Sequence, residues 1–94
     1  MKPVFICLAV MVLLTFATGA KAACYADYKA KQDNPLRLHY GVAEISTCSA
    51  AAAQTELGPR LAAAGWTLLN IVSVFDQSGL AERQASAGPN FLRF

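Results

Sequence analysis

The segment Gly65–Phe75, with the sequence GWTLLNIVSVF, carries the strongest strand signal in the chain. It is rich in β-branched and aromatic residues and is apolar on both faces, a composition typical of strands that are covered on both sides. We therefore expect Trp66–Phe75 to form the central strand of a sheet. Gly65, directly before it, fits the left-handed backbone position that often follows the end of a helix.

An alanine-rich segment precedes this strand and predicts a helix from Ala50 to Ala64. Alanine has the best helix propensity, and the hydroxyl-bearing residues in Ser46–Ser49 are good N-caps. Gly58-Pro59 interrupts the pattern, because a proline inside a helix removes one backbone hydrogen bond. The sequence therefore predicts a kink or a break near Leu57.

Residues 36–45 alternate between apolar and polar side chains, which is the pattern of a strand with one buried face. We expect Leu36, Leu38, Tyr40 and Val42 on the buried face, with Arg37, His39 and Gly41 on the other. The sequence therefore predicts a half-buried strand that ends near Ile45.

The two ends of the remaining chain carry weaker patterns. Residues 23–35 are polar and lack a clean period, and we interpret them as an N-terminal arm with at most one turn of helix. Leu80–Ala87 predicts a short helix, and Asn90–Phe94 predicts a last strand in which Phe94 packs into the sheet. The predicted fold class is α+β in the order strand, helix, strand, helix, strand. A small three-stranded sheet carries one main helix, within a single domain that spans residues 23–94.

The first 22 residues have the features of a secretory signal peptide. A positive start at Lys2 is followed by the apolar run Val4–Phe16, and small residues surround Lys21. Ala20 and Ala22 occupy the two positions that a signal peptidase reads, which places the cut before Ala23. We therefore expect residues 23–94 to be exported to the periplasm or secreted.

Two other interpretations of this segment remain open. The uncharged run Val4–Ala20 only reaches the lower limit of about 17 residues for a membrane-spanning helix. A lipoprotein would be acylated on Cys24, which would tether the protein to a membrane. Lipoprotein processing favours an aliphatic residue three positions before the cysteine, and Lys21 occupies that place.

Cys24 and Cys48 are an even pair of cysteines in a chain that is predicted to enter an oxidising compartment. We expect them to form a disulfide, which closes a loop of about 25 residues and stabilises the fold by roughly 3.5 kcal/mol. A redox site would favour a CxxC spacing. A zinc site would need further ligands, and His39 is the only histidine.

Length and composition exclude several classes of protein. The chain has 94 residues, of which 55% are hydrophobic and 15% charged, so it is too short for a TIM barrel or a dinucleotide-binding fold and too apolar for a disordered chain. The net charge of +2 is too weak for a nucleic-acid binder, and loss of Lys2 and Lys21 brings acidic and basic residues into balance. We expect neither a nucleic-acid partner nor, after signal cleavage, a membrane. No cofactor or metal is predicted, since the sequence lacks a phosphate-binding loop and metal-ligand spacing.

Two stretches of the chain resemble known groups of proteins. Gly65–Val72, placed after an Ala/Leu helix and followed by Phe91-Leu92-Arg93, resembles small α+β domains of unknown function. Those domains are marked by a helix, a G-W-E-L-V segment and a Y/F-x-L-K/R strand. The likeness covers roughly His39–Phe94, with Thr67 where an acidic residue is usual. The whole chain also resembles small exported proteobacterial proteins that carry LRLHYGV and GWTLLN stretches. The resemblance implies a helix packed on an antiparallel sheet, and no activity comes with it.

His39 is the one residue with a candidate catalytic role. It would act as a base together with Asp27 or Asp33. A histidine at the surface or edge of the sheet is the favoured interpretation, because no nucleophile lies at a suitable spacing.

Candidate binding residues are polar or aromatic. Asn70, Asp76 and Arg83 would line a small polar patch where the main strand meets the second helix, although capping by Asp76 and a solvated Arg83 are favoured. Trp66 and Tyr40 would offer aromatic contacts to a ligand, and packing in the core or at the edge is again the favoured role.

Two classes of function follow from these residues. The favoured one is a non-catalytic exported module that binds an unknown protein or small ligand through an exposed sheet edge or an aromatic patch. The alternative is a small periplasmic enzyme or enzyme inhibitor that uses His39. The enzyme requires His39 beside a carboxylate or hydroxyl in a concave pocket.

Overall fold

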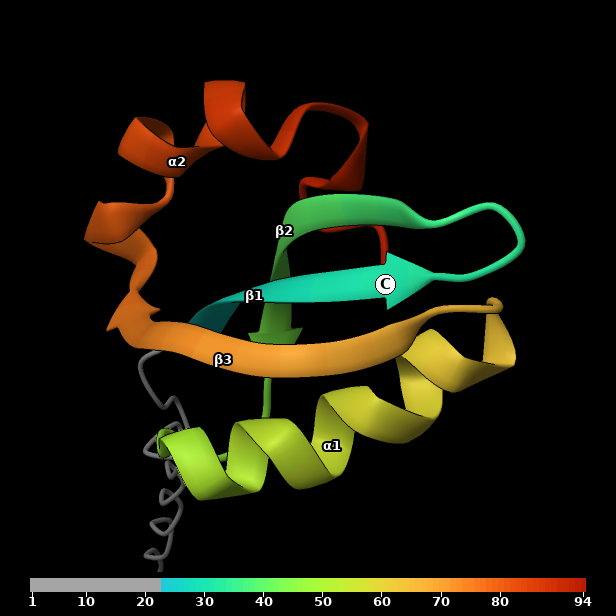
Figure 1. Cartoon of the computed structure of the whole chain (residues 1–94). Coiled ribbons are helices and arrows are strands. Elements are labelled where there is room, and N and C mark those ends of the chain that lie inside the picture. The colour runs from blue at the N-terminus through green and yellow to red at the C-terminus, as the bar shows by residue number, and fades with distance from the viewer. Residues whose placement is uncertain (1–22) are drawn as a thin grey trace, which may run out of the picture.

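The computed structural model describes residues 23–94 (Figure 1), so the predicted signal peptide lies outside the described residues. Its elements are β1 (Cys24–Gln32), β2 (Arg37–Ile45), α1 (Ala50–Ala63), β3 (Thr67–Asp76), the 3-10 turn η2 (Gln77–Gly79), α2 (Ala81–Ala87) and the 3-10 turn η3 (Gly88–Asn90). Within residues 23–94, no helix combines the length and apolar character that a membrane crossing requires.

The three strands form one antiparallel sheet in the order β2-β1-β3. The α+β class with a three-stranded sheet and a main helix is therefore confirmed. From Arg37 onward the order strand, helix, strand, helix also matches the prediction. The third strand differs from the prediction. It is formed by residues 24–32, whereas residues 90–94 were expected to form it.

The predicted N-terminal arm is the central strand of the sheet. Its side chains alternate, with Cys24, Ala26, Tyr28 and Ala30 buried on the side that faces α1. The sequence analysis did not recognise this alternation, because three of the four buried residues are small and therefore give a weak apolar signal between polar neighbours. Small residues suffice here because α1 packs directly on this face of β1.

The segment predicted to be the central strand is an edge strand. Among residues 23–94, β3 pairs with β1 alone. Its register shifts twice, between the partners of Asp27 and Tyr28 and between those of Lys29 and Ala30. The extra residues at these bulges are Leu69 and Val72, which are 47% and 48% exposed. Bulges of this kind disturb the regular pairing of an edge.

Helix α1 begins at the N-cap Ser49, whose side chain accepts a hydrogen bond from the Ala52 amide (3.1 Å). It runs through Pro59 as one helix, so of the predicted kink or break the break is wrong. Leu57 and Leu61, on either side of Pro59, are both fully buried against the sheet. This burial offsets the backbone hydrogen bond that the proline removes. Gly65 has the predicted left-handed conformation (φ 87°).

The predicted disulfide is confirmed. Cys24 at the start of β1 is bonded to Cys48, just before α1, with a Cα–Cα distance of 5.6 Å. The bond ties the first residue of the central strand to the segment that leads into the main helix. The disulfide therefore fixes α1 to the sheet covalently.

Tyr28 and Gly41 are paired across β1 and β2, and their contact explains the glycine. The fully buried Tyr28 ring lies over Gly41, so a Cβ at position 41 would overlap the ring and its hydroxyl. An aromatic side chain that covers a glycine on the neighbouring strand fills the space that the missing side chain leaves.

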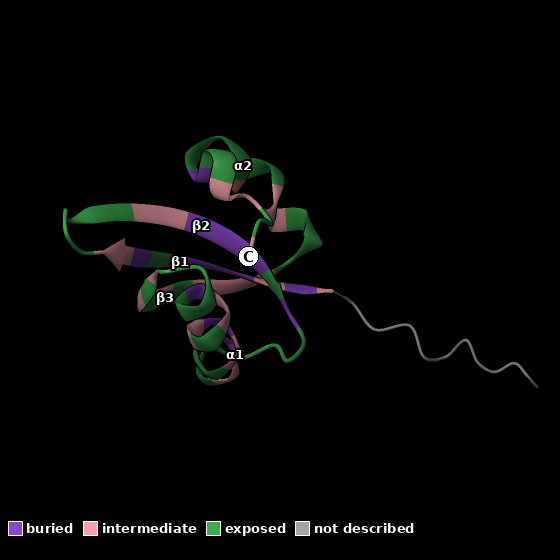
Figure 2. Ribbon diagram, turned by 90° about the vertical axis from the view of Figure 1, so that its right-hand side faces the viewer, coloured by how far each residue is buried: buried purple, intermediate pink, exposed green. Residues whose placement is uncertain are grey.

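The helices lie on opposite sides of the sheet, and Figure 2 shows α1 below β3 and α2 above β2. The chain after α2 forms no strand of the predicted kind. Phe91 makes an isolated parallel bridge with Val42, and the Leu92 amide donates a hydrogen bond to the Val42 oxygen (2.8 Å). Leu92 has a positive φ of 56°, which turns the chain away after this one contact. Phe94 then packs against the core cluster on the α1 side.

Candidate functional site

A buried carboxylate lies at the centre of the face that α2 covers. Asp27 on β1 is 4% exposed and accepts hydrogen bonds from the hydroxyls of Tyr40 (2.7 Å) and Ser73 (2.6 Å). Arg83 of α2 donates its Nε–H to the same carboxylate (3.2 Å). The cluster therefore joins all three strands to the short helix.

The charge state of Asp27 follows from these partners. Burial raises the pKa of its carboxyl, and the hydrogen bonds from Ser73, Tyr40 and Arg83, with the Arg83 charge, lower it by more. The pKa is therefore below its ordinary value, and Asp27 is ionised at neutral pH. Burial and the bond to Asp27 raise the pKa of Tyr40 to about 12, so its hydroxyl stays protonated and donates.

Arg83 has its donors engaged within the chain. Besides Asp27, it donates to the Gly79 oxygen (2.7 Å) and the Glu82 carboxylate (2.8 Å), and its guanidinium lies 3.9 Å from the Phe75 ring centroid. A shallow polar depression of about 460 Å³ is lined by Tyr40, Glu82, Arg83 and Ser86. Because the arginine is bonded on several sides, we assign this cluster to the attachment of α2.

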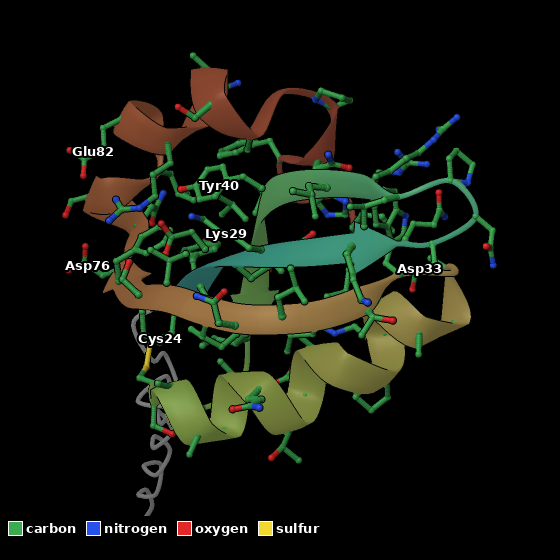
Figure 3. The ribbon with its side chains drawn as sticks, in the orientation of Figure 1. Cys24, Lys29, Asp33, Tyr40, Asp76 and Glu82 are labelled. Carbon is green, nitrogen blue, oxygen red and sulfur yellow. A yellow bond between two sulfur atoms is a disulfide. The ribbon has the colours of Figure 1, made fainter. Side chains whose placement is uncertain are left out.

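The other half of the same sheet face is not covered by α2. A depression of about 270 Å³ lies there, lined by Lys29, Ala30, Leu38, His39, Tyr40 and Leu69. We call this region the open face and define it by the side chains of Lys29, Leu38, Tyr40, Leu69 and Asn70. Figure 3 labels Lys29 and Tyr40, which are direct partners on β1 and β2.

The two leucines of the open face are exposed. Leu38 is 67% exposed and Leu69 is 47% exposed, whereas the prediction placed Leu36 and Leu38 on the buried side of β2. Val42 is buried as predicted, but Leu38 is not, because α1 packs on the opposite face of β2, which carries Gly41 and Ala43. Exposed leucines beside a depression are typical of an interaction surface.

His39 packs among aromatic side chains on the α1 side of the sheet. Its ring centroid lies 4.2 Å from that of Trp66 and 5.6 Å from that of Phe94, and Nε2 is 3.1 Å from the Tyr28 hydroxyl. Burial, with the nearby Arg93 charge, lowers the pKa of His39, and its Nδ1 is buried without a partner among residues 23–94. Burial also raises the pKa of Tyr28 to about 12, so this hydroxyl is not a base at neutral pH.

The two acids considered as partners of His39 are engaged elsewhere. Asp27 faces the other side of the sheet, in the cluster with Arg83. Asp33 forms an ion pair with Lys31 (3.3 Å). The contacts of His39 are therefore those of a packed side chain.

The predicted polar patch divides into separate places. Asp76 caps η2 by accepting from the Ser78 amide (3.0 Å), as the capping interpretation expected. Arg83 bonds to Asp27, and Asn70 lies on the open face opposite Lys29. Trp66 packs on the α1 side with His39, so of the predicted binding residues only Tyr40 and Asn70 belong to the open face.

The sequence analysis did not predict the hydrogen bond between Asp27 and Ser73. It also did not predict that Lys29, Leu38 and Leu69 form one surface. Alternation in residues 24–31 would have placed Asp27 and Lys29 on one face. The positions of Leu38 and Leu69 on the same surface depend on strand pairing, for which the sequence carried no local signal.

No protein family, curated protein or solved structure matches the chain. The likeness to the G-W-E-L-V domains stays a prediction. The function is therefore inferred from the geometry of this chain alone.

Proposed function

We propose that this protein is a non-catalytic exported module that binds a partner protein or small ligand at the open face. The observation that carries the proposal is the exposure of Leu38 and Leu69 around a depression on a face that α2 covers only in part. The α1 side of the same sheet buries its apolar residues, whereas Leu38 and Leu69 lie exposed together beside this depression.

Export before Ala23 belongs to the same proposal and is supported by the disulfide. A disulfide persists in oxidising compartments, and the periplasm or the extracellular space is such a compartment. The alternative lipid anchor requires the Cys24 sulfur, and this sulfur is already bonded to Cys48. Mass spectrometry of the exported protein should give a chain that begins at Ala23 and has two hydrogens fewer than the reduced form.

Site-specific crosslinking in the exporting host tests the binding function. A photo-crosslinking residue at Leu38 should give a discrete adduct, because this side chain faces the partner. The same residue at Thr55, an exposed position on α1, is the matched control and should give none. Adding Leu69→Asp should abolish the Leu38 adduct by placing a charge in the depression. Equal adducts from both positions, or none from Leu38, would contradict the proposal.

A further inference from the structure

The outer edge of β2 borders the open face and carries main-chain groups that the described part of the chain leaves unpaired. In an antiparallel strand every second residue turns its N–H and C=O away from the neighbouring strand. The Val42 oxygen accepts from Leu92, and the Glu44 oxygen accepts from Arg60 (2.9 Å), so the even-numbered residues of β2 face outward. Leu38 and Tyr40 share this direction.

The chain uses this edge in part and leaves the rest free. Its own segment at Phe91-Leu92 covers the edge at Val42. Within the described residues, no side chain or loop bonds to the main chain of Leu38 or Tyr40. The unused part of the edge lies directly beside the depression that these two side chains line.

The two edges of the sheet differ in their suitability for another strand. β2 pairs with β1 in unbroken register over nine residues. β3 carries two bulges, which displace its outward groups from the spacing of a regular strand. An added strand can therefore pair with the regular edge of β2, whereas the bulges of β3 disfavour such pairing.

The positive charge near this edge favours an acidic segment over a second copy of this chain. The hairpin end of the sheet carries Lys29, Lys31 and Arg37 against one acid, Asp33, which is already paired with Lys31. Lys29 and Arg37 have no ion-pair partner among residues 23–94. Figure 3 shows Asp76 and Glu82 at the opposite end of the sheet from Asp33. Two copies of this chain joined through β2 would bring their basic residues together, whereas an acidic segment would pair with them.

We infer that residues 38–40 of β2 form a strand-addition site for an extended, acidic peptide segment of another protein. The segment hydrogen-bonds to the free main-chain groups of Leu38 and Tyr40. Alternate apolar side chains lie on the open face beside Leu38 and Tyr40, and the carboxylates between them lie on the opposite face of the sheet, on the side of Arg37. This is main-chain recognition with side-chain pockets, the mode by which peptides extend a sheet. The inference rests on the proposed function, because it names the partner class of the open face.

Titration of the oxidised protein with three synthetic peptides, blocked at both ends, tests this inference by NMR. The peptides are TVEVEVET, its lysine counterpart TVKVKVKT, and TVEVEVET with every second amide N-methylated. We expect the acidic peptide to shift the amide signals of Leu38 and Tyr40 and to slow their exchange. The Val74 amide, on β3, should not change. The basic and the N-methylated peptides should bind at least about tenfold more weakly.

Two protein variants separate main-chain from side-chain recognition. Leu38→Pro removes an outward N–H at a position where an edge strand tolerates proline, and should weaken binding by about tenfold or more beyond Leu38→Ala. Arg37→Glu should reverse the preference between the acidic and basic peptides. An unchanged far-ultraviolet spectrum and melting temperature of each variant is the control for folding.

The outcomes distinguish this inference from the proposed function. Equal binding of the N-methylated peptide, or equal binding of the basic peptide, would overturn the inference. Dimerisation through Leu38 and Tyr40 without peptide, seen by sedimentation, would assign the edge to a second copy and overturn it as well. If the peptides fail while the Leu38 crosslink persists, the binding function stands and the strand-addition site is wrong. If both fail, both proposals are wrong.

Discussion

The two faces of the sheet are attached to their helices by different forces. On the α1 side, Ala53, Leu57 and Leu61 are fully buried, and the disulfide adds a covalent bond. On the other side, α2 buries only Ala87 and is held by the bonds of Arg83 to Asp27. A small domain with balanced charge can in this way leave a surface free. Its apolar residues fill one face, and one polar cluster holds a short helix over half of the other.

Loss of the disulfide is the largest test of this comparison. The variant Cys24→Ser with Cys48→Ser should lower the free energy of unfolding by about 3 kcal/mol, because the unfolded chain regains the freedom of the closed loop. Urea denaturation of the wild type under oxidising and reducing conditions should give the same difference. A change below about 1 kcal/mol would mean that apolar packing alone holds the α1 side.

Gly41→Ala tests the packing of the α1 side without the covalent bond. The added methyl group overlaps the buried Tyr28 ring and should cost about 2 kcal/mol of unfolding free energy. Gly58→Ala is the matched control, because nothing lies within 4 Å of its Cβ position and it sits inside α1. The control should gain up to about 1 kcal/mol from helix propensity. Equal effects of the two variants in denaturation would contradict the tight contact at Gly41.

Asp27→Asn tests the polar attachment of α2. It removes a buried charge that three side chains bond to, and should cost about 1.5 kcal/mol. Hydrogen exchange should accelerate in Ala81–Ala87 and stay unchanged in α1. A double-mutant cycle with Arg83→Gln should show coupling between the two sites. Additive effects, or faster exchange in α1, would show that the two faces are not attached separately.

Lowering the pH should reduce stability in two steps, first through His39 on the α1 side and then through Asp27 on the other side. We expect these steps to be smaller than the effects of the variants above. The folded pKa of His39 is below its ordinary value of 6.5, so the unfolded state binds the proton more readily. Stability should therefore fall as the pH drops below about 6.5 towards the folded pKa. Asp27 also has a lowered pKa, and its contribution should be lost only below 3.8. Urea denaturation over this range measures both steps. His39→Phe should remove the first step, and a slope that persists in this variant would assign it to another group.

The parts of the fold that the sequence predicted are those with local signals. The cap at Ser49, the alanine run and the left-handed Gly65 define α1, and alternation defines β2. The open face carried no such signal. Tyr40 and Asn70 were predicted as binding residues, whereas Leu38 was assigned to the core, because alternation shows that two faces differ without showing which one a helix covers.

Local periodicity and a simple count of cysteines were enough to predict the main helix, two of the three strands, the partner of Cys24 and the α+β class. The central position of Cys24–Gln32 in the sheet and the exposure of Leu38 on β2 follow from tertiary packing. Both depend on contacts between residues that are far apart along the chain. Asp27 is held by residues 46 and 56 positions away, and no local pattern encodes contacts of that separation.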